Sequence, residues 1–119
     1  MIQEAYCSFE VARLLEEKGF NEVVHAYHNI FDKVNLDFNV SVDAPHLQIP
    51  CPTHQMAMAW LRETYGIDII IEISDPSVKD RKYYCNIWDC NNNSHILDLF
   101  NSYEDAVEAA LKYCLENLI

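Results

Sequence analysis

Glycine, clustered positive charge and long apolar runs are scarce or missing in this sequence. It has only two glycines, Gly19 and Gly66, so it contains no glycine-rich loop that could cradle nucleotide phosphates. Its 119 residues include 8 Lys or Arg against 19 Asp or Glu, a net charge of −11, and the basic residues form no run. Binding to nucleic-acid phosphates or to anionic membranes depends on clustered cations, and we therefore expect neither.

The sequence also lacks the signals of membrane insertion and secretion. No apolar stretch reaches the length of a membrane-spanning helix, and the first residues lack the basic region and apolar core of a secretion signal. The five cysteines are odd in number and irregularly spaced, unlike a disulfide framework, and we interpret them as reduced thiols that pack as small apolar side chains. These observations predict a cytoplasmic protein.

What is present is the composition of a folded domain. Half of the residues are hydrophobic, which is typical of a chain with a packed core and not of a disordered one. A chain of 119 residues can bury such a core without disulfides or a structural metal. Because no internal repeat or flexible linker occurs, we predict a single domain over residues 1–119.

The clearest strand pattern lies in the last third of the chain. Isoleucines alternate with polar residues from Ile67 to Ile73, which is the period of a strand with one buried face, and only Ile70 breaks the alternation. Two further strands between residues 83 and 100 are predicted to form a hairpin around a turn at Asn91 to Ser94, because Asn tolerates the left-handed conformations of tight turns.

Three segments have the apolar spacing of amphipathic helices. The predicted helices cover residues 9–18, 54–65 and 103–118. Each follows a residue whose hydroxyl can cap the first turn, namely Ser8, Thr53 or Ser102. The first two end at Gly19 and Gly66, where glycine can adopt the left-handed conformation that closes a helix.

The remaining segments predict shorter strands. Residues 22–28 and 36–42 have the composition of strands, and Pro45, Pro50 and Pro52 are expected to exclude regular structure before the next helix. The sequence therefore predicts an α+β fold with an antiparallel sheet of three to five strands and about three helices, in the order α-β-(β)-α-β-β-β-α. We expect the last helix to pack its apolar stripe on the sheet.

Three residues offer a candidate catalytic or metal site. Cys51 and His54 bracket the start of a predicted helix, and a proline-rich loop could hold His46 nearby. Cys and His ligands suit zinc, and a thiol at a helix N-terminus beside a His can act as a nucleophile. A structural zinc site needs four ligands, however, and no second ligand pair accompanies these residues. We therefore expect no bound metal and no other cofactor.

Aromatic residues indicate a different kind of site. Tyr84 and Trp88 fall on the same face of one predicted strand, and Ile70 interrupts the polar side of the strand before it. If this face is uncovered, these three residues form an apolar surface of the kind that recognises protein partners. The alternative is that helices from the N-terminal half of the chain cover the face.

Three separated segments resemble, in order, a group of small uncharacterised proteins from phage-related and mobile regions of gut bacterial genomes. The segments are CSFEVARLL at residues 7–15, QMAMAWLRE at 55–63 and YEDAVEAALKYCL at 103–115. The resemblance covers most of the chain. It implies an accessory protein of a mobile element, which more often binds than catalyses, and it assigns no functional residue.

Two classes of function follow. We expect a small non-enzymatic interaction module that forms a homodimer or binds another protein through an acidic or aromatic surface, and an acidic protein of this kind can imitate nucleic acid toward a DNA-binding partner. The alternative is a hydrolase or metal-dependent enzyme centred on Cys51, His54 and His46. An exposed Tyr84 and Trp88 would favour the module, and a cleft in which the other three residues converge would favour the enzyme.

Overall fold

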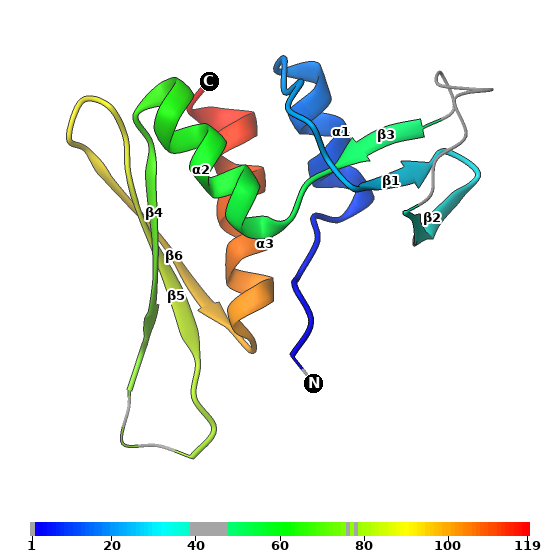
Figure 1. Ribbon diagram of the computed structural model, residues 1–119. Coiled ribbons are helices and arrows are strands. Elements are labelled where there is room, and N and C mark those ends of the chain that lie inside the picture. Colours follow the sequence, from blue (N-terminus) through cyan, green and yellow to red (C-terminus); the bar gives the residue numbers. More distant parts are fainter. Residues whose placement is uncertain (1, 39–47, 76, 78) are drawn as a thin grey trace. The chain divides into compact units, whose positions relative to one another are not determined.

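The computed structural model describes residues 2–38, 48–75, 77 and 79–119, and these form three helices and two three-stranded antiparallel sheets (Figure 1). The elements are α1 (Phe9–Glu17), β1 (Ala26–Asn29), β2 (Asp32–Asp37), β3 (Gln48–Cys51), α2 (His54–Tyr65), β4 (Asp68–Ile73), β5 (Tyr83–Trp88), β6 (Ser94–Phe100) and α3 (Tyr103–Asn117). The predicted α+β class and antiparallel pairing are confirmed, and the order of elements agrees except for one additional strand, β3. No helix in the described ranges is long and apolar enough to cross a membrane.

The chain separates into two compact units. The first comprises Met1–Ala57 and the second Met58–Ile119, and the boundary falls within α2. The prediction of a single domain over residues 1–119 stays a prediction.

In the first unit, helix α1 has the predicted signals at both ends. The hydroxyl of Ser8 accepts a hydrogen bond from the Val11 amide at 3.2 Å. After the helix, Gly19 has a φ of +95°, and the amide of Phe20 donates to the Leu15 carbonyl at 2.9 Å. This is the C-terminal arrangement in which a left-handed residue lets the next amide satisfy an otherwise orphaned carbonyl. The signals at both ends of α1 are confirmed.

The sheet of the first unit has the strand order β2-β1-β3. Strand β3 corrects the prediction that the prolines exclude regular structure, because Pro50 lies within it and is paired with Tyr27 of β1. Proline lacks an amide hydrogen, but an edge strand needs ladder bonds on one side only and therefore tolerates it. The strand predicted at residues 36–42 is found in part as β2, and its residues 39–42 lie outside the described part of the chain.

Helix α2 begins and ends where the sequence predicts. The Met56 amide donates to the hydroxyl of Thr53 at 3.2 Å, which confirms Thr53 as the capping residue. The helix ends at Tyr65, and Gly66 follows with a φ of +67°. The left-handed conformation at Gly66 turns the chain out of the helix, and β4 starts two residues later.

The second unit consists of the sheet β4-β5-β6 and helix α3, which packs against all three strands. The Asp105 amide donates to the hydroxyl of Ser102 at 3.0 Å, so the predicted cap of this helix is also confirmed. Its apolar stripe is fully buried together with the residues of the central strand that face it. The buried residues of α3 and β5 are Cys85, Ile87, Ala106, Val107, Ala110, Leu111, Cys114 and Leu115.

The alternation of isoleucines in β4 is found with one exception. Ile69 and Ile71 are partly buried, and Ile67, just before the strand, is fully buried. Ile73 was expected on the same buried face, but it is 37 % exposed. It lies in the terminal pair of the β4–β5 ladder, opposite Tyr83, at the end of the strand.

Candidate interaction surface

The β5–β6 hairpin is organised by the side chain of Asp89. Its Oδ1 accepts hydrogen bonds from the amides of Asn91 at 2.9 Å and Asn93 at 3.0 Å, and Asn92 adopts a positive φ of 65°. Asp and Asn favour such turns because their side chains bond to nearby backbone groups and tolerate the left-handed region. The turn therefore spans Asp89 to Asn93, and β6 begins at Ser94. It starts two residues earlier and ends one residue earlier than the predicted turn at Asn91 to Ser94.

The pairing of the strands brings alternate residues together on the face away from α3, which we call the open face. Asp68 of β4 is paired with Trp88 of β5, which is paired with Ser94 of β6. In the next row on the same face, Ile70 is paired with Asn86, and Asn86 with Ile96. Directly opposed side chains on one face of an antiparallel sheet lie close enough to touch, so these rows form a continuous surface.

A bulge in β6 adds a further apolar residue to the open face. Tyr83 is paired with Phe100 and Cys85 with Leu97, so one residue of β5, Tyr84, stands opposite two residues of β6. These two are Asp98 and Leu99, and both are exposed. An extra residue in one strand shifts the alternation by one position. The bulge thus keeps Phe100 on the covered side while Leu99 remains on the surface.

The open face contains five large apolar or aromatic residues. We call Ile70, Tyr84, Trp88, Ile96 and Leu99 the open-face patch. Its exposed fractions are 42 % at Ile70, 39 % at Trp88, 61 % at Ile96 and 57 % at Leu99, while Tyr84 is partly buried. Single exposed apolar residues are common on protein surfaces, but a group on three adjacent strands is typical of an interaction surface.

Carboxylates border the open-face patch. Asp68 stands opposite Trp88, Glu72 stands opposite Tyr84, and Asp98 lies in the bulge beside Leu99. The Tyr84 hydroxyl donates a hydrogen bond to Glu72, and this bond to the carboxylate raises the pKa of Tyr84. The Tyr84 hydroxyl therefore stays protonated at physiological pH, and its hydrogen bond to Glu72 holds the side chain in place. The open face thus carries Asn86 between Ile70 and Ile96 in its middle row, and the aromatic residues of the adjacent rows stand beside carboxylates.

The covered face of the same sheet has a different chemistry. The Cys85 thiol donates to the Ala106 carbonyl of α3 at 2.9 Å, and burial raises the pKa of Cys85 to about 11. Burial, together with the nearby Cys85, raises the pKa of Cys114 to about 12. Thiols with such pKa values are not ionised near neutral pH, and the thiolate is the nucleophilic form. Cys85 and Cys114 therefore act as packed core side chains and not as nucleophiles.

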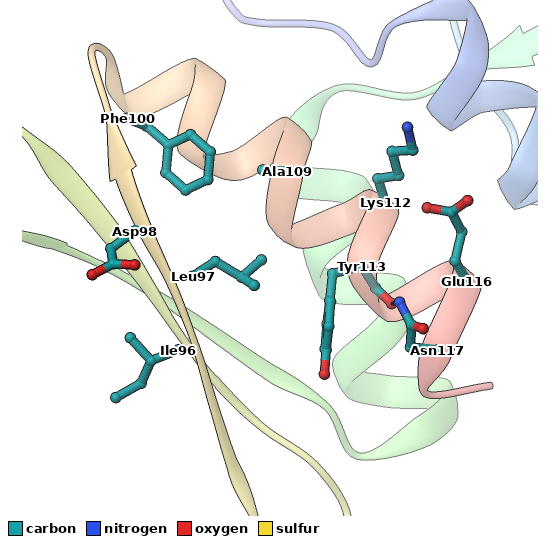
Figure 2. Close-up of a pocket in the computed structure, with 9 residues that line it drawn as sticks. All are labelled: Ile96, Leu97, Asp98, Phe100, Ala109, Lys112, Tyr113, Glu116 and Asn117. Carbon is teal, nitrogen blue, oxygen red and sulfur yellow. Dashed lines mark hydrogen bonds between the residues drawn. The ribbon is translucent and has the colours of Figure 1, made fainter.

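A groove opens between β6 and α3 at one edge of the covered side. It has a volume of about 390 Å³ and is lined by residues of both elements, among them Leu97, Phe100, Ala109 and Tyr113. Figure 2 shows Leu97 and Phe100 on the side of β6 that faces α3, and Ile96 and Asp98 on the opposite side of the strand. The groove and the open-face patch thus meet at the same strand.

One end of this groove is connected to the hairpin turn through a histidine. His95 Nε2 lies 3.0 Å from Asp89 Oδ2, and His95 Nδ1 shares a hydrogen bond of 3.1 Å with the Tyr113 hydroxyl. The hydrogen bond from His95, followed by the amides of Asn93 and Asn91, lowers the pKa of Asp89. This network fixes the turn of the hairpin to helix α3. The sequence gives no local signal for it, because His95 and Tyr113 are 18 residues apart.

The structure places the candidate catalytic residues differently. His46 lies outside the described residues, so the convergence of all three cannot be described. Cys51 is fully buried, and its thiol donates to the Cys7 carbonyl at 3.0 Å. The same carbonyl lies 2.9 Å from Nε2 of the buried His28. A carbonyl oxygen can accept two hydrogen bonds, and here it holds Cys51 and His28 in the interior of the first unit.

Burial also argues against chemistry at Cys51 and His54. His54 is 4 % exposed, and its amide donates to the Ala5 carbonyl at 2.9 Å. A nucleophile and its base must reach a substrate, which side chains in the interior do not. Within the described ranges, no group of three or more His, Cys, Asp or Glu side chains is placed to hold a metal ion.

In comparisons with known proteins, no family model, no curated protein and no solved structure matches this chain. The resemblance to proteins of phage-related and mobile regions stays a prediction. The open-face patch includes Ile70, Tyr84 and Trp88, the three residues that the sequence suggested for an interaction surface, and their role in binding also stays a prediction. Sequence reasoning missed Ile96 and Leu99. Ile96 could have been found from the strand register, because Asn86 of β5 pairs with Ile70 on one side and with Ile96 on the other.

Proposed function

We propose that this chain is a small non-enzymatic interaction module that binds a protein partner through the open-face patch. The observation that supports the proposal is the placement of five large apolar or aromatic residues on the open face of β4, β5 and β6. Burying such side chains in a contact removes apolar surface from water, which is the dominant favourable term in most protein association. Trp88 and Tyr84 are the residue types that contribute most often to binding hot spots.

The negative charge beside the patch supports a basic partner. Asp68, Glu72 and Asp98 surround the patch, and the whole chain has a net charge of −11. A homodimer formed through this face would bring the same carboxylates of two copies together, which is unfavourable. A partner with an apolar contact surface bordered by Lys or Arg avoids this repulsion and associates faster. We therefore favour a different, basic protein over a second copy.

The cellular setting is part of the proposal. The five cysteines, all within the described residues, are in the reduced form, which suits the reducing cytoplasm. The resemblance to proteins of mobile genetic regions supports an accessory role in such an element. The alternative of a Cys/His hydrolase lacks support, because the side chains of Cys51 and His54 are buried away from any substrate.

The proposal can be tested with a photoreactive side chain at the patch. Ile96 is replaced by benzoylphenylalanine in one bait, and Val23, which is 83 % exposed outside the helices and strands of the first unit, is replaced in a control bait. Both baits are expressed in the native host, irradiated and analysed by mass spectrometry. We expect the Ile96 probe to crosslink a basic protein that the Val23 probe does not.

Two results would contradict this assignment. Equal crosslinking of the same proteins from Ile96 and Val23 would show that the patch has no specific partner. Crosslinks only between two copies of the chain would identify a homodimer and refute the basic partner.

A further inference from the structure

Strand β6 lies at an edge of its sheet. In the order β4-β5-β6 it pairs with β5, and among the described residues it has no strand on its other side. Alternate backbone N–H and C=O groups of an edge strand point away from the sheet and can pair with another extended chain.

The sequence of β6 does little to block such pairing. Exposed edges are usually protected by short strands, lysines, prolines or bulges; β6 has seven residues, Ser94–Phe100, with neither Lys nor Pro, and its bulge lies near its C-terminal end. Ile96 and Leu99 are instead more than half exposed on it. The bulge at Asp98 and Leu99 leaves the stretch from Ser94 to Leu97 as the regular part of the edge.

The groove beside this edge can receive side chains. It is lined by Leu97 and Phe100 of β6 and by Ala109, Lys112, Tyr113 and Glu116 of α3 (Figure 2). Its volume of about 390 Å³ is at the lower end of the range of ligand pockets, which is about 300–1,000 Å³. Apolar walls with a few polar groups at the rim suit one or two side chains of a peptide.

We propose that an extended segment of the partner protein adds to the edge of β6 as a fourth strand of the sheet. Successive side chains of a strand point to opposite faces, so alternate residues of the segment enter the groove and the others extend over the open-face patch beside Ile96. One bound strand thereby uses both apolar features. This inference rests on the proposed function, because it specifies how the partner engages the same module.

Charge defines the composition of the segment. The second unit has five Lys or Arg and eleven Asp or Glu, a net charge of −6. The groove lining contains Glu116 and Lys112 of α3, and it also includes Asp98 of β6, which Figure 2 shows on the side of the strand away from α3. We therefore assign a segment with apolar residues at alternate positions and at least one Lys or Arg, which can reach Asp98 on the open side of β6 or Glu116 on α3. A second copy of β6 offers neither Lys nor Arg and meets repulsion between two acidic chains.

The probe is a phage-displayed library of random peptides of about twelve residues, long enough to pair along the strand. Selection on the whole chain is expected to enrich basic peptides with apolar residues two positions apart. Alternate backbone amides of a bound strand point to its two opposite edges. The best peptide is then synthesised in two forms, each with the amides of one of these edges methylated. Methylation of the edge that pairs with β6 removes its hydrogen bonds and should weaken binding about tenfold or more, whereas methylation of the other edge should not.

Three variants of the chain test the location. Ala109→Leu fills the groove and retains high helix propensity, and Glu116→Lys reverses a charge at its rim. Glu22→Lys makes the same charge change at an exposed residue of the first unit and serves as the matched control. We expect the first two to weaken peptide binding about tenfold with an unchanged melting temperature and the control to bind normally.

The outcomes separate this inference from the proposed function. Equal binding of both methylated peptides, failure to select any binding peptide, or normal binding by Ala109→Leu and Glu116→Lys would overturn strand addition. If those results were obtained while Trp88→Ala still abolished partner crosslinking, the open face would remain the binding surface without an added strand. If the peptide bound at β6 and the partner did not depend on Trp88, strand addition would stand and the open-face contact would fall.

Discussion

The two faces of the sheet β4-β5-β6 are built from the same three strands and differ in what they contact. On the covered face, Cys85 and Ile87 are fully buried with α3. On the open face, Trp88 and Ile96 remain 39 % and 61 % exposed, although their side chains are as large and apolar as those on the other side. A sheet that is apolar on both faces is normally covered on both.

Apolar side chains therefore have different roles on the two faces: on the covered face they stabilise the fold, and on the open face they are available to a partner. On the covered face, removing apolar atoms leaves a cavity and costs free energy of unfolding. On the open face the same removal costs little folding free energy but reduces what a partner can bury. Each prediction below breaks or sharpens this contrast.

The largest expected effect is on folding. Ile87→Ala should lower the free energy of unfolding by about 2–5 kcal/mol, because it removes a fully buried side chain from the covered face. Ile96→Ala on the neighbouring strand should lower it by less than about 1 kcal/mol. Urea unfolding of both variants measures the difference. A cost at Ile96 equal to that at Ile87 would mean that the open face is also covered.

The next largest effect concerns binding. Trp88→Ala should weaken partner binding about thirtyfold, which corresponds to the loss of a hot spot of about 2 kcal/mol. The circular dichroism spectrum and melting behaviour should stay close to those of the native chain, because Trp88 is not part of the buried core. A variant that unfolds, together with a native protein that binds no partner, would show that Trp88 is a core residue.

Thiol chemistry sharpens the contrast further. Cys90 is exposed within the hairpin turn, whereas Cys7, Cys51, Cys85 and Cys114 are buried. Iodoacetamide at pH about 8 should modify Cys90 alone in the folded protein, since burial raises the pKa of Cys85 to about 11 and of Cys114 to about 12. All five should react after denaturation. Peptide mass mapping identifies the modified sites, and rapid native labelling of Cys114 would refute the packing of α3.

A smaller effect is expected at the hairpin turn and depends on pH. The hydrogen bond from His95 and the turn amides lower the pKa of Asp89 below its unfolded value. The ionised carboxylate therefore contributes stability that is present above the unfolded pKa and is lost as the pH falls through the lowered folded pKa. Asp89→Asn should be less stable than the native chain at neutral pH, and this gap should close in acid. A gap independent of pH would contradict the assignment.

The smallest expected effect is that of metal removal. The purified protein should contain substoichiometric zinc, and a chelator should leave its melting temperature unchanged. Elemental analysis and thermal melts provide the measurement. One zinc ion per chain would revive the enzyme hypothesis at Cys51, His54 and His46.

Local features of the fold could be predicted because they depend on near neighbours in the sequence. Ser8, Thr53 and Ser102 cap their helices as expected, since a cap needs only an amide three residues away. The isoleucine alternation identified β4, and the asparagines that begin at Asn91 identified the hairpin turn, although not the part played by Asp89. The pattern of apolar positions thus predicted the three helices and the strand β4.

Features that depend on long-range pairing could not be predicted. Strand β3 was missed because the acceptability of Pro50 depends on its place at a sheet edge. The bulge that exposes Leu99 follows from the pairing of β6 with β5, and strict alternation would have placed Leu99 on the covered face. Of the candidate site, the three residues on β4 and β5 were found from periodicity, whereas Ile96, Leu99 and the groove required the hairpin register and the position of α3.

The most direct test of the open-face patch is a quantitative capture experiment with three immobilised baits. They are the native chain, the double variant Trp88→Ala with Ile96→Ser, and Val23→Ser, which removes an apolar side chain that is 83 % exposed outside the patch. Each is incubated with the same host lysate at about 0.15 M salt, which screens long-range charge effects, and bound proteins are quantified by mass spectrometry. We predict that a basic protein is retained by the native chain and by Val23→Ser and is depleted about tenfold or more by the double variant. Equal retention of all proteins by the three folded baits would contradict the account.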